Sequence, residues 1–341
     1  MYNDFAINSY LTFRFVYGDH EWKKDIKQFK PKLQNLEEYL VDNSDEIINA
    51  FSTIFSKINL DKTTLLISGG IDSAILASFL KKDMKVYSIK FEAENSLDET
   101  IVASQYAKEY GLNLTIIKIS FNDYLSVVEK LIKNKNSPLH PIEPALYLAA
   151  QKIKSDGFDN IITGFNADIK FGGLDLLLAK NWEIDEFIKR FSFVDSKKVL
   201  ENYIDMKFVF KKYLKGKNID TILFLKEVYG YDTSLAFLNS IRSADCDLVA
   251  PYSYLKLKNK LDIGRIRNGE SKYHLKEVFK KRYKNFNIPK KISFARPLDQ
   301  WLYKWDGPKR NEFKQNINIS EFNGNQKWLI YCLEYFLNFN D

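Results

Sequence analysis

The sequence feature that most constrains the fold is a glycine turn between an apolar run and an amphipathic segment. Residues 63–68, "TTLLIS", have the composition of a short β-strand, and residues 73–82, "SAILASFLKK", place apolar residues at helical spacing. Gly69 and Gly70 lie between them and allow a ligand to approach the backbone closely. A turn between a strand and a helix directs backbone N–H groups at an anion. The sequence therefore predicts an anion-binding loop.

The turn also contains an acid, within the string "SGGIDS" at residues 68–73. The Walker pattern is absent, because no Lys-Ser or Lys-Thr follows the glycines, and GxGxxG is absent as well. Asp72 beside a phosphate would be repelled unless a cation lay between them, which indicates Mg²⁺. Ser68 and Ser73 can donate hydroxyl hydrogen bonds. The alternative is a structural turn in which the acid or a serine caps the helix.

Strand-like and helix-like segments alternate after the turn. The strands are expected at 85–91, 112–120 and 158–164, and the helices at 97–111, 122–134 and 144–156. This alternation predicts the α/β class, with a parallel sheet covered by helices on both faces. Ligands of such sheets bind outside the carboxyl ends of the strands, where the loops at 68–72 and 164–173 would lie.

The pattern changes near residue 180, beyond which apolar residues recur at helical spacing with few strand signals. We expect three parts. Residues 1–58 form an N-terminal segment, of which 36–57 is predicted to be helical. Residues 59–185 form the α/β region, and residues 186–341 form a helical region that completes the site.

Composition excludes several classes of protein. The net charge of +7 permits polyphosphate or nucleic-acid binding, although a lysine-rich surface is a sufficient explanation. No stretch approaches the roughly 20 apolar residues of a membrane helix, and the first residues lack the order of a signal peptide. Cys246 and Cys332 offer neither a disulfide framework nor a zinc spacing, so we expect a cytoplasmic protein.

Several strings together resemble a known family. "SGGIDS" is the SGGxDS signature of the PP-loop ATP pyrophosphatases, and the chain from about 36 to 305 resembles the synthetase domain of asparagine synthetase B and β-lactam synthetase. The similar segments are 85–119, 161–173 ("IITGFNADIKFGG"), 243–255 and 289–302 ("PKKISFARPLDQWL"). The resemblance implies a five-stranded, doubly wound sheet of the adenine nucleotide α-hydrolase (HUP) type with a helical C-terminal half.

The resemblance also implies a reaction and roles for residues. ATP would activate a carboxylate as an acyl-adenylate, releasing pyrophosphate, and a nitrogen nucleophile would then form an amide and release AMP. Asp72 and Asp168 would hold Mg²⁺, and Lys291 would lie against the departing phosphates as a catalytic point charge. The residues expected to bind the nucleotide are Ser68, Gly69, Gly70, Asp72, Ser73, Ser88 and Gly164.

Two positions depart from the family pattern. Phe165 stands where asparagine synthetase has Glu and β-lactam synthetase has Tyr, and phenylalanine cannot transfer a proton. Asp247, at the family's later acidic position, is the candidate base, with Asp245 nearby; alternatively, a neutral nucleophile such as ammonia needs no base. Ile169 replaces the acid that follows the loop aspartate in asparagine synthetase, so we expect an acyl substrate other than aspartate.

A glutaminase domain is not expected, because only about 60 residues precede the signature and no cysteine precedes Cys246. Nitrogen would come from free ammonia, a separate glutaminase subunit or an amine. The acyl substrate would be a small-molecule or sugar carboxylate, in a surface-glycan or secondary-metabolite pathway. His140, in a loop expected to face the site, could touch substrate, but a plain loop histidine is the simpler interpretation. Arg296 could bind a second carboxylate.

Two other functions compete with the ligase. A tRNA-modifying PP-loop enzyme fits the positive charge, but the chain has no CxxC pair and no appended RNA-binding module. A non-catalytic nucleotide-binding relative fits Phe165, but the other expected site residues are all present.

Overall fold

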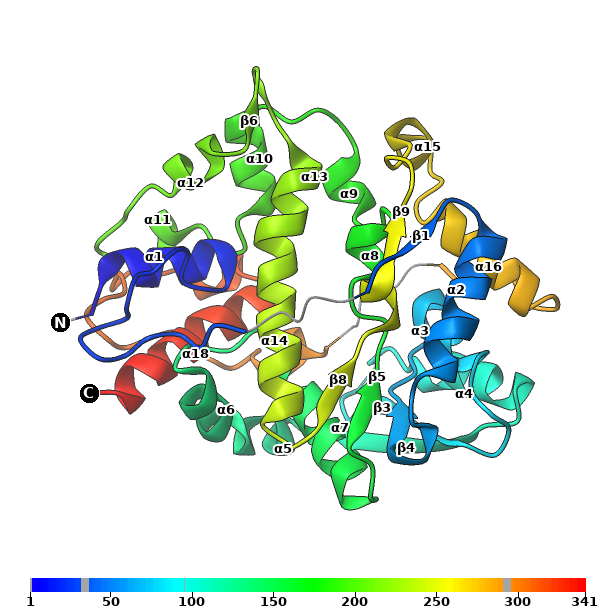
Figure 1. The fold of residues 1–341 in the computed structure, drawn as a ribbon. Helices are drawn as coiled ribbons and strands as arrows, with labels where there is room; N and C mark the ends of the chain where they lie inside the picture. Colours follow the sequence, from blue (N-terminus) through cyan, green and yellow to red (C-terminus); the bar gives the residue numbers. More distant parts are fainter. Residues whose placement is uncertain (1, 32–36, 95, 291–295) are drawn as a thin grey trace.

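A parallel β-sheet flanked by helices forms the centre of the computed structural model, which describes residues 2–31, 37–94, 96–290 and 296–341 (Figure 1). The strands are β2 (Thr63–Leu65), β3 (Lys85–Phe91), β4 (Asn113–Ile119), β5 (Asn160–Ile162) and β8 (Asp247–Val249). β5 pairs in parallel with β2 and β8, and β3 pairs in parallel with β4. A parallel bridge between Leu66 and Tyr87, and a 2.7 Å hydrogen bond from Ile67 N–H to the Tyr87 carbonyl, join the two groups. The resulting order β4-β3-β2-β5-β8 confirms the predicted five-stranded sheet.

Helices cover both faces of this sheet. Successive side chains of a strand point to opposite faces, so apolar side chains on both faces are buried against helices. Val86 and Ile162 belong to one buried cluster with side chains of α2, α3, α4 and α16, whereas Tyr87 and Ile161 belong to another with α6, α7 and α18. The bounds of these helices are α2 (Ser44–Ser56), α3 (Ile71–Ala77), α4 (Thr100–Glu109), α6 (Val128–Lys135), α7 (Glu143–Ser155), α16 (Tyr273–Arg282) and α18 (Gly324–Phe339). The predicted doubly wound arrangement is therefore confirmed.

The C-terminal half is mainly helical, as predicted. Its longest continuous helical stretch consists of α13 (Thr221–Phe224), the π-helical turn η2 (Leu225–Tyr229) and α14 (Gly230–Arg242). α14 lies beside α7 and leads into β8 (Figure 1). The other helices are α5 (Phe121–Ser126), α8 (Ala167–Lys170), α9 (Asp175–Leu178), α10 (Ile184–Phe191), α11 (Ser196–Val199), α12 (Lys207–Lys211), α15 (Ile263–Arg267) and α17 (Leu298–Trp301). The 3₁₀ turns are η1 (Leu60–Lys62), η3 (Pro251–Tyr254) and η4 (Ile319–Glu321), and a hairpin joins β6 (Leu214–Lys215) to β7 (Asn218–Ile219).

The N-terminal residues contribute to two places in the fold. α1 (Asp4–Phe13) packs against α11 and α18, whereas β1 (Tyr39–Val41) pairs in parallel with β9 (Leu255–Leu257). The prediction of helix over 36–57 is thus correct for α2 but wrong for residues 39–41, whose backbone pairs with a strand that follows by more than 200 residues. Such a non-local pairing is not visible in local periodicity. The proposed boundary at residue 58 stays a prediction.

None of the helices in the described ranges is both long enough and apolar enough to cross a membrane.

Candidate nucleotide and metal site

The glycine turn follows β2 and precedes α3, as the sequence predicts. Hydrogen bonds between its two serines fix its shape: Ser68 N–H donates to Ser73 Oγ at 2.9 Å, and the two Oγ atoms are 3.1 Å apart. Gly70 N–H donates to Ser68 Oγ at 3.3 Å. The structure thus brings Ser68, Gly69, Gly70, Asp72 and Ser73 into one compact loop at the carboxyl end of β2.

The fold itself does not require both glycines of this loop. Neither Gly69 nor Gly70 has a positive φ, and Gly70 has φ −85°. A Cβ at Gly69 would meet its nearest neighbour, the Glu99 carbonyl oxygen, at 3.4 Å, and a Cβ at Gly70 would meet only Ser68 Oγ, at 3.5 Å. Ordinary contacts of this length permit alanine, so the glycines leave space for something other than this chain.

Two aspartates from separate loops converge on a single cation. Asp72 lies in the first turn of α3, and Asp168 lies in α8 after β5. The ammonium of Lys272 forms ion pairs with Asp72 Oδ2 and, at 2.7 Å, with Asp168 Oδ1. The Lys272 side chain is only 8% exposed. This arrangement confirms that the acids of the two predicted loops lie together.

Glycines make this convergence possible in the second loop. A Cβ at Gly164 would lie 3.1 Å from Asp72 Cβ, and a Cβ at Gly173 would lie 1.9 Å from Asp168 Oδ1 and 2.3 Å from Lys272 Cε. A side chain at position 173 would therefore displace the acid and the ammonium together. Gly164 lies two residues after the end of β5, and its backbone lies against the start of α3.

Other groups hold the two loops in place. Tyr252 in η3 donates its hydroxyl hydrogen to the Asp72 carbonyl at 2.9 Å. Asn166, which adopts the left-handed conformation at φ 71°, donates to Ser253 Oγ at 2.8 Å. Lys170 donates to the Ser253 carbonyl at 2.7 Å. These contacts give the segment 251–255, which resembles a family motif, a positioning role.

Lys272 is the site residue that sequence reasoning missed. It precedes α16 with a left-handed φ of 53°, and the surrounding string "GESKYHLKEVF" has the pattern of an ordinary amphipathic helix start. Burial alone lowers the pKa of Lys272, but the charges of Asp72 and Asp168 outweigh this effect and raise it above its usual value. The ammonium therefore stays charged. No local sequence signal marks this position.

The acid pair fits a magnesium ion. Mg²⁺ prefers oxygen ligands and is commonly held by one or two carboxylates together with substrate phosphates. Asp72 and Asp168 already converge on one cation, and within the described ranges no cluster of three or more His, Cys, Asp or Glu side chains is found. Two carboxylates leave the remaining coordination positions for phosphate oxygens and water.

The remaining predicted residues are placed as follows. Ser88 is buried in the middle of β3. The carbonyl of the preceding residue, Tyr87, accepts a hydrogen bond from the N–H of Ile67, just before the glycine turn. Lys291 lies outside the described residues, so its catalytic role stays a prediction. Phe165 is buried against Phe237 of α14, with ring centroids 5.0 Å apart.

Asp247 is not brought to the site, and this corrects the sequence analysis. It is exposed at the amino end of β8, where it pairs with Asn160 at the amino end of β5. The amino ends of parallel strands lie at the sheet edge opposite the loops that follow their carboxyl ends. A general-base role for Asp247 at the glycine turn does not agree with this position. The neighbouring Asp245 is exposed as well.

The similar chains among solved structures have low TM-scores and low sequence identities. The NH3-dependent NAD synthetase of Campylobacter jejuni has 18% identity and a TM-score of 0.25, covering 38% of this chain and 58% of its own. The U34-tRNA thiolase NcsA of Methanococcus maripaludis has 15% identity and a TM-score of 0.27, covering 76% of this chain and 92% of its own. Scores this low do not define a common fold.

Comparisons of sequence are more informative. A Methanocaldococcus jannaschii protein named "Putative asparagine synthetase 1", glutamine-hydrolyzing, is 27% identical over 182 residues, which cover 45% of this chain and 33% of that protein. The protein named amidase chry2 of Gibberella zeae is 28% identical over 131 residues, 33% of this chain and 20% of its own. The matched segments thus span a third or less of these relatives. The family profile of asparagine synthase matches residues 61–232, half of the chain, and includes both acids of the site. The chain therefore belongs to the asparagine synthase family.

Proposed function

We propose that this protein is an ATP-dependent, AMP-forming ligase that joins a carboxylate to ammonia or an amine. The observation that carries the proposal is the convergence of Asp72 and Asp168 on one buried cation position beside a glycine turn whose glycines the fold does not require. A triphosphate with its metal needs such a position, since its negative charges must be neutralised before another anion can attack.

Bond changes in the proposed reaction balance without a redox partner. A substrate carboxylate oxygen attacks the α-phosphorus of ATP, the bond to the bridging oxygen breaks, and pyrophosphate leaves with the electron pair. The nitrogen nucleophile then attacks the acyl carbon, the bond to the AMP oxygen breaks, and the nitrogen loses a proton. Bound Mg²⁺ would supply charge neutralisation for the phosphates.

Residues of this chain have separate parts in this scheme. The N–H groups of the turn and the hydroxyls of Ser68 and Ser73 bind the pyrophosphate portion, and Asp72 and Asp168 hold the metal. The Lys272 ammonium adds a positive charge within reach of the same phosphates. Phe165 offers no proton acceptor, and Asp247 lies at the other sheet edge, so a nucleophile that arrives neutral, such as ammonia, fits best.

The substrate carboxylate is proposed to be a small molecule or a sugar acid rather than aspartate, because Ile169 replaces an acid of the aspartate enzymes. The nitrogen source is proposed to be ammonia, either free or delivered by a separate glutaminase subunit. No described feature favours the tRNA-modifying or the non-catalytic alternative.

Exchange of labelled pyrophosphate into ATP tests the proposal directly. The assay contains Mg²⁺ and pools of small acids and sugar acids but no amine, and we expect exchange with one pool. Asp72→Asn should reduce this exchange by more than about 100-fold, on the scale of a lost electrostatic contact with a reacting group. Asp83→Asn is the matched control, because Asp83 is exposed, lies in a turn at φ 66°, and can be replaced by an asparagine that tolerates this conformation. ATP binding without exchange from any pool would contradict the proposal.

A further inference from the structure

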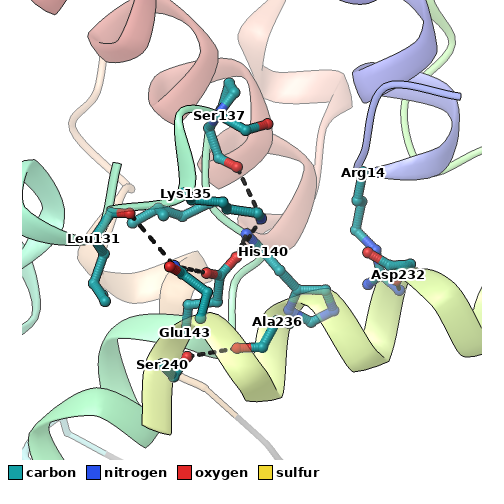
Figure 2. A network of polar contacts seen from close by, with 12 residues as sticks. Arg14, Leu131, Lys135, Ser137, His140, Glu143, Asp232, Ala236 and Ser240 are labelled. Carbon is teal, nitrogen blue, oxygen red and sulfur yellow. Dashed lines mark hydrogen bonds and ion pairs between the residues drawn. The ribbon is translucent and has the colours of Figure 1, made fainter. Parts of the chain in front are cut away.

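A buried ion pair fixes the loop between α6 and α7. Lys135 and Glu143 are 1% and 0% exposed, and their charged atoms are 2.6 Å apart (Figure 2). Glu143 also accepts the His140 backbone N–H and the Asn239 side-chain amide, each at 2.6 Å, while Lys135 donates to the Pro138 carbonyl at 3.1 Å. A buried ion pair whose other hydrogen-bonding groups also have partners is held in a single geometry. The loop that carries His140 is thereby tied to α14.

This geometry determines the protonation of His140. The Ile142 backbone N–H donates to His140 Nδ1 at 2.9 Å, so Nδ1 carries no proton. Burial, together with the charges of Arg14, Arg296 and Lys135, holds the pKa of His140 well below its usual value, so the ring is neutral. The single ring proton is therefore on Nε2, which makes no hydrogen bond within the described part of the chain. His140 is 7% exposed, and its Nε2–H is a donor that no described residue uses and that stays accessible at the edge of the mostly buried ring.

Arg14 supplies a second unused donor. It ends α1 in the left-handed conformation, and its Nη2 forms an ion pair with Asp232 of α14. The guanidinium also lies 3.5 Å from the centre of the Phe193 ring. Its Nε is buried and has no hydrogen-bond partner among the described residues. A guanidinium held on one edge by an acid and on its face by a ring has its remaining N–H groups fixed in direction.

The two donors lie near the candidate site. In Figure 2 the His140 ring lies over α14, between the Lys135–Glu143 pair and the Arg14–Asp232 pair. Tyr229, three residues before Asp232, is close enough to Asp168, Arg14 and Asp232 for all three charges to act on its pKa. A Cβ at Gly230, the first residue of α14, would lie 3.6 Å from Ile169 Cδ1, so this end of the helix lies beside the residue that follows Asp168. Tyr229 ends the π-helical turn of this helix, and such turns frequently occur at functional sites.

We propose that His140 and Arg14 bind the acyl substrate by donating hydrogen bonds to an oxygen of it other than the carboxylate that reacts. The inference rests on the proposed function and specifies the substrate class: an acid with a second acceptor group, a carboxylate or a carbonyl. Glu143 is a positioning residue in this proposal, because it acts through the His140 backbone.

The test uses His140→Leu, which removes the donor, and His140→Gln, whose amide N–H can replace Nε2–H. His20→Leu is the control, since His20 is exposed. Pyrophosphate exchange is measured with succinate, glutarate, L-aspartate, L-glutamate and glucuronate, and with propionate and butyrate as monocarboxylates. We expect His140→Leu to raise the half-saturating concentration of the supporting acid at least tenfold, to change that of ATP less than twofold, and to be rescued within threefold by Gln.

A second measurement separates this inference from the proposed function. Three histidines make ¹⁵N NMR of the wild-type imidazoles simple to assign. The same acids are added to protein that is saturated with Mg²⁺ and the non-cleavable α,β-methylene analogue of ATP. A shift of the His140 Nε2–H signal supports the substrate contact even if no acid supports exchange, a result that would refute the ligase proposal alone. Three outcomes overturn the inference. The first is exchange without a shift of the signal, and the second is an equal change in the half-saturating concentrations of ATP and of the acid. The third is the absence of both exchange and shift.

Discussion

Single residues decide the charge balance of the candidate site. Asp72 and Asp168 would repel each other without a cation, and Lys272 supplies that cation from a part of the chain 104 residues beyond Asp168. The same two carboxylates are the proposed magnesium ligands, so the ammonium and the metal compete for overlapping oxygens. This competition can be measured without knowing the acyl substrate.

Lys272→Met should therefore make the protein more dependent on Mg²⁺. Removing one partner of a buried ion pair costs about 3–5 kcal/mol, and the 40% exposure of Asp168 places the expected loss at the lower end. We expect the variant to unfold at a lower temperature than the wild type without metal, and millimolar Mg²⁺ to restore more of its stability than it adds to the wild type. Thermal unfolding with EDTA and with Mg²⁺ measures both effects. Equal responses of the two proteins to Mg²⁺ would show that the metal does not bind the acid pair.

His140 should give the protein an acid-sensitive stability. In the unfolded chain a histidine takes up a proton near pH 6.5, whereas burial and the surrounding cations keep the folded His140 neutral. The unfolded state then binds more protons, so stability falls as the pH drops below about 6.5. Relative to His140→Gln, the wild type should lose up to about 2 kcal/mol between pH 7.5 and 5, at about 1.4 kcal/mol per pH unit.

Urea unfolding of both proteins at several pH values measures this difference. The charged groups that face His140 (Arg14, Arg296 and Lys135, with Asp232 beyond) are present in both proteins, so their own titration largely cancels. Burial raises the pKa of Asp232 to about 6, which makes the comparison with the variant necessary. A difference that is constant across this pH range would mean that the folded His140 titrates normally.

At the scale of elements, the strand–turn–helix unit is the part that local sequence describes best. The apolar run, the glycines and the helix start are adjacent in the chain, and their structure follows from local rules. The loop after β5 was likewise located by its position at a strand end. By contrast, the left-handed Lys272, the π-helical turn and the pairing of β1 with β9 depend on partners more than 100 residues away or on packing, which periodicity does not report.

Gly69→Ala should separate folding from nucleotide binding. A Cβ at this position has ordinary contact distances, so we expect the free energy of unfolding to change by less than about 1 kcal/mol. The affinity for ATP with Mg²⁺ should fall at least tenfold, because the added methyl group occupies space that a phosphate would need. Calorimetric titration and urea unfolding give the two numbers. A variant with normal ATP affinity would place the phosphates elsewhere.

Glu143→Gln should be costly, because it leaves the buried Lys135 charge without its counter-ion. We expect a loss of about 3–5 kcal/mol in the free energy of unfolding. Glu321→Gln is the matched control, since the Lys198–Glu321 pair is 57% and 50% exposed and its loss should leave the free energy of unfolding nearly unchanged. Similar losses in the two variants would show that Lys135 finds other partners.

At the scale of the whole molecule, the sequence predicts the parallel sheet with helices on both faces and the meeting of the two acidic loops, but not the order of the strands. It does not show which acidic residues lie far from the candidate site. The resemblance assigns Asp247 to the site by its match to the family's later acidic position. In the structure β8 runs from the opposite edge of the sheet towards the site, so Asp247, its first residue, lies at the far end. Direction within a sheet follows from tertiary pairing, which a motif alone does not contain.

The whole chain should use ammonium and not glutamine as its nitrogen source. Hydrolysis of glutamine by a cysteine nucleophile needs a reactive thiolate, and both cysteines of this chain are buried. Burial raises the pKa of Cys246 to about 11 and that of Cys332 well above its usual value, the opposite of an activated thiol. With the substrate found by exchange, AMP formation should depend on ammonium, and glutamine should release no glutamate. Glutamate release by the purified chain would refute this expectation.

The long span between Asp168 and Lys272 has a consequence for synthesis on the ribosome. At about 5–20 residues per second, 272 − 168 = 104 residues take roughly 5–20 s to add. During that interval the nascent chain contains both carboxylates but not the ammonium that neutralises them. If the two loops meet before Lys272 is added, another cation must offset the repulsion between their carboxylates, and Lys272 then takes over that position.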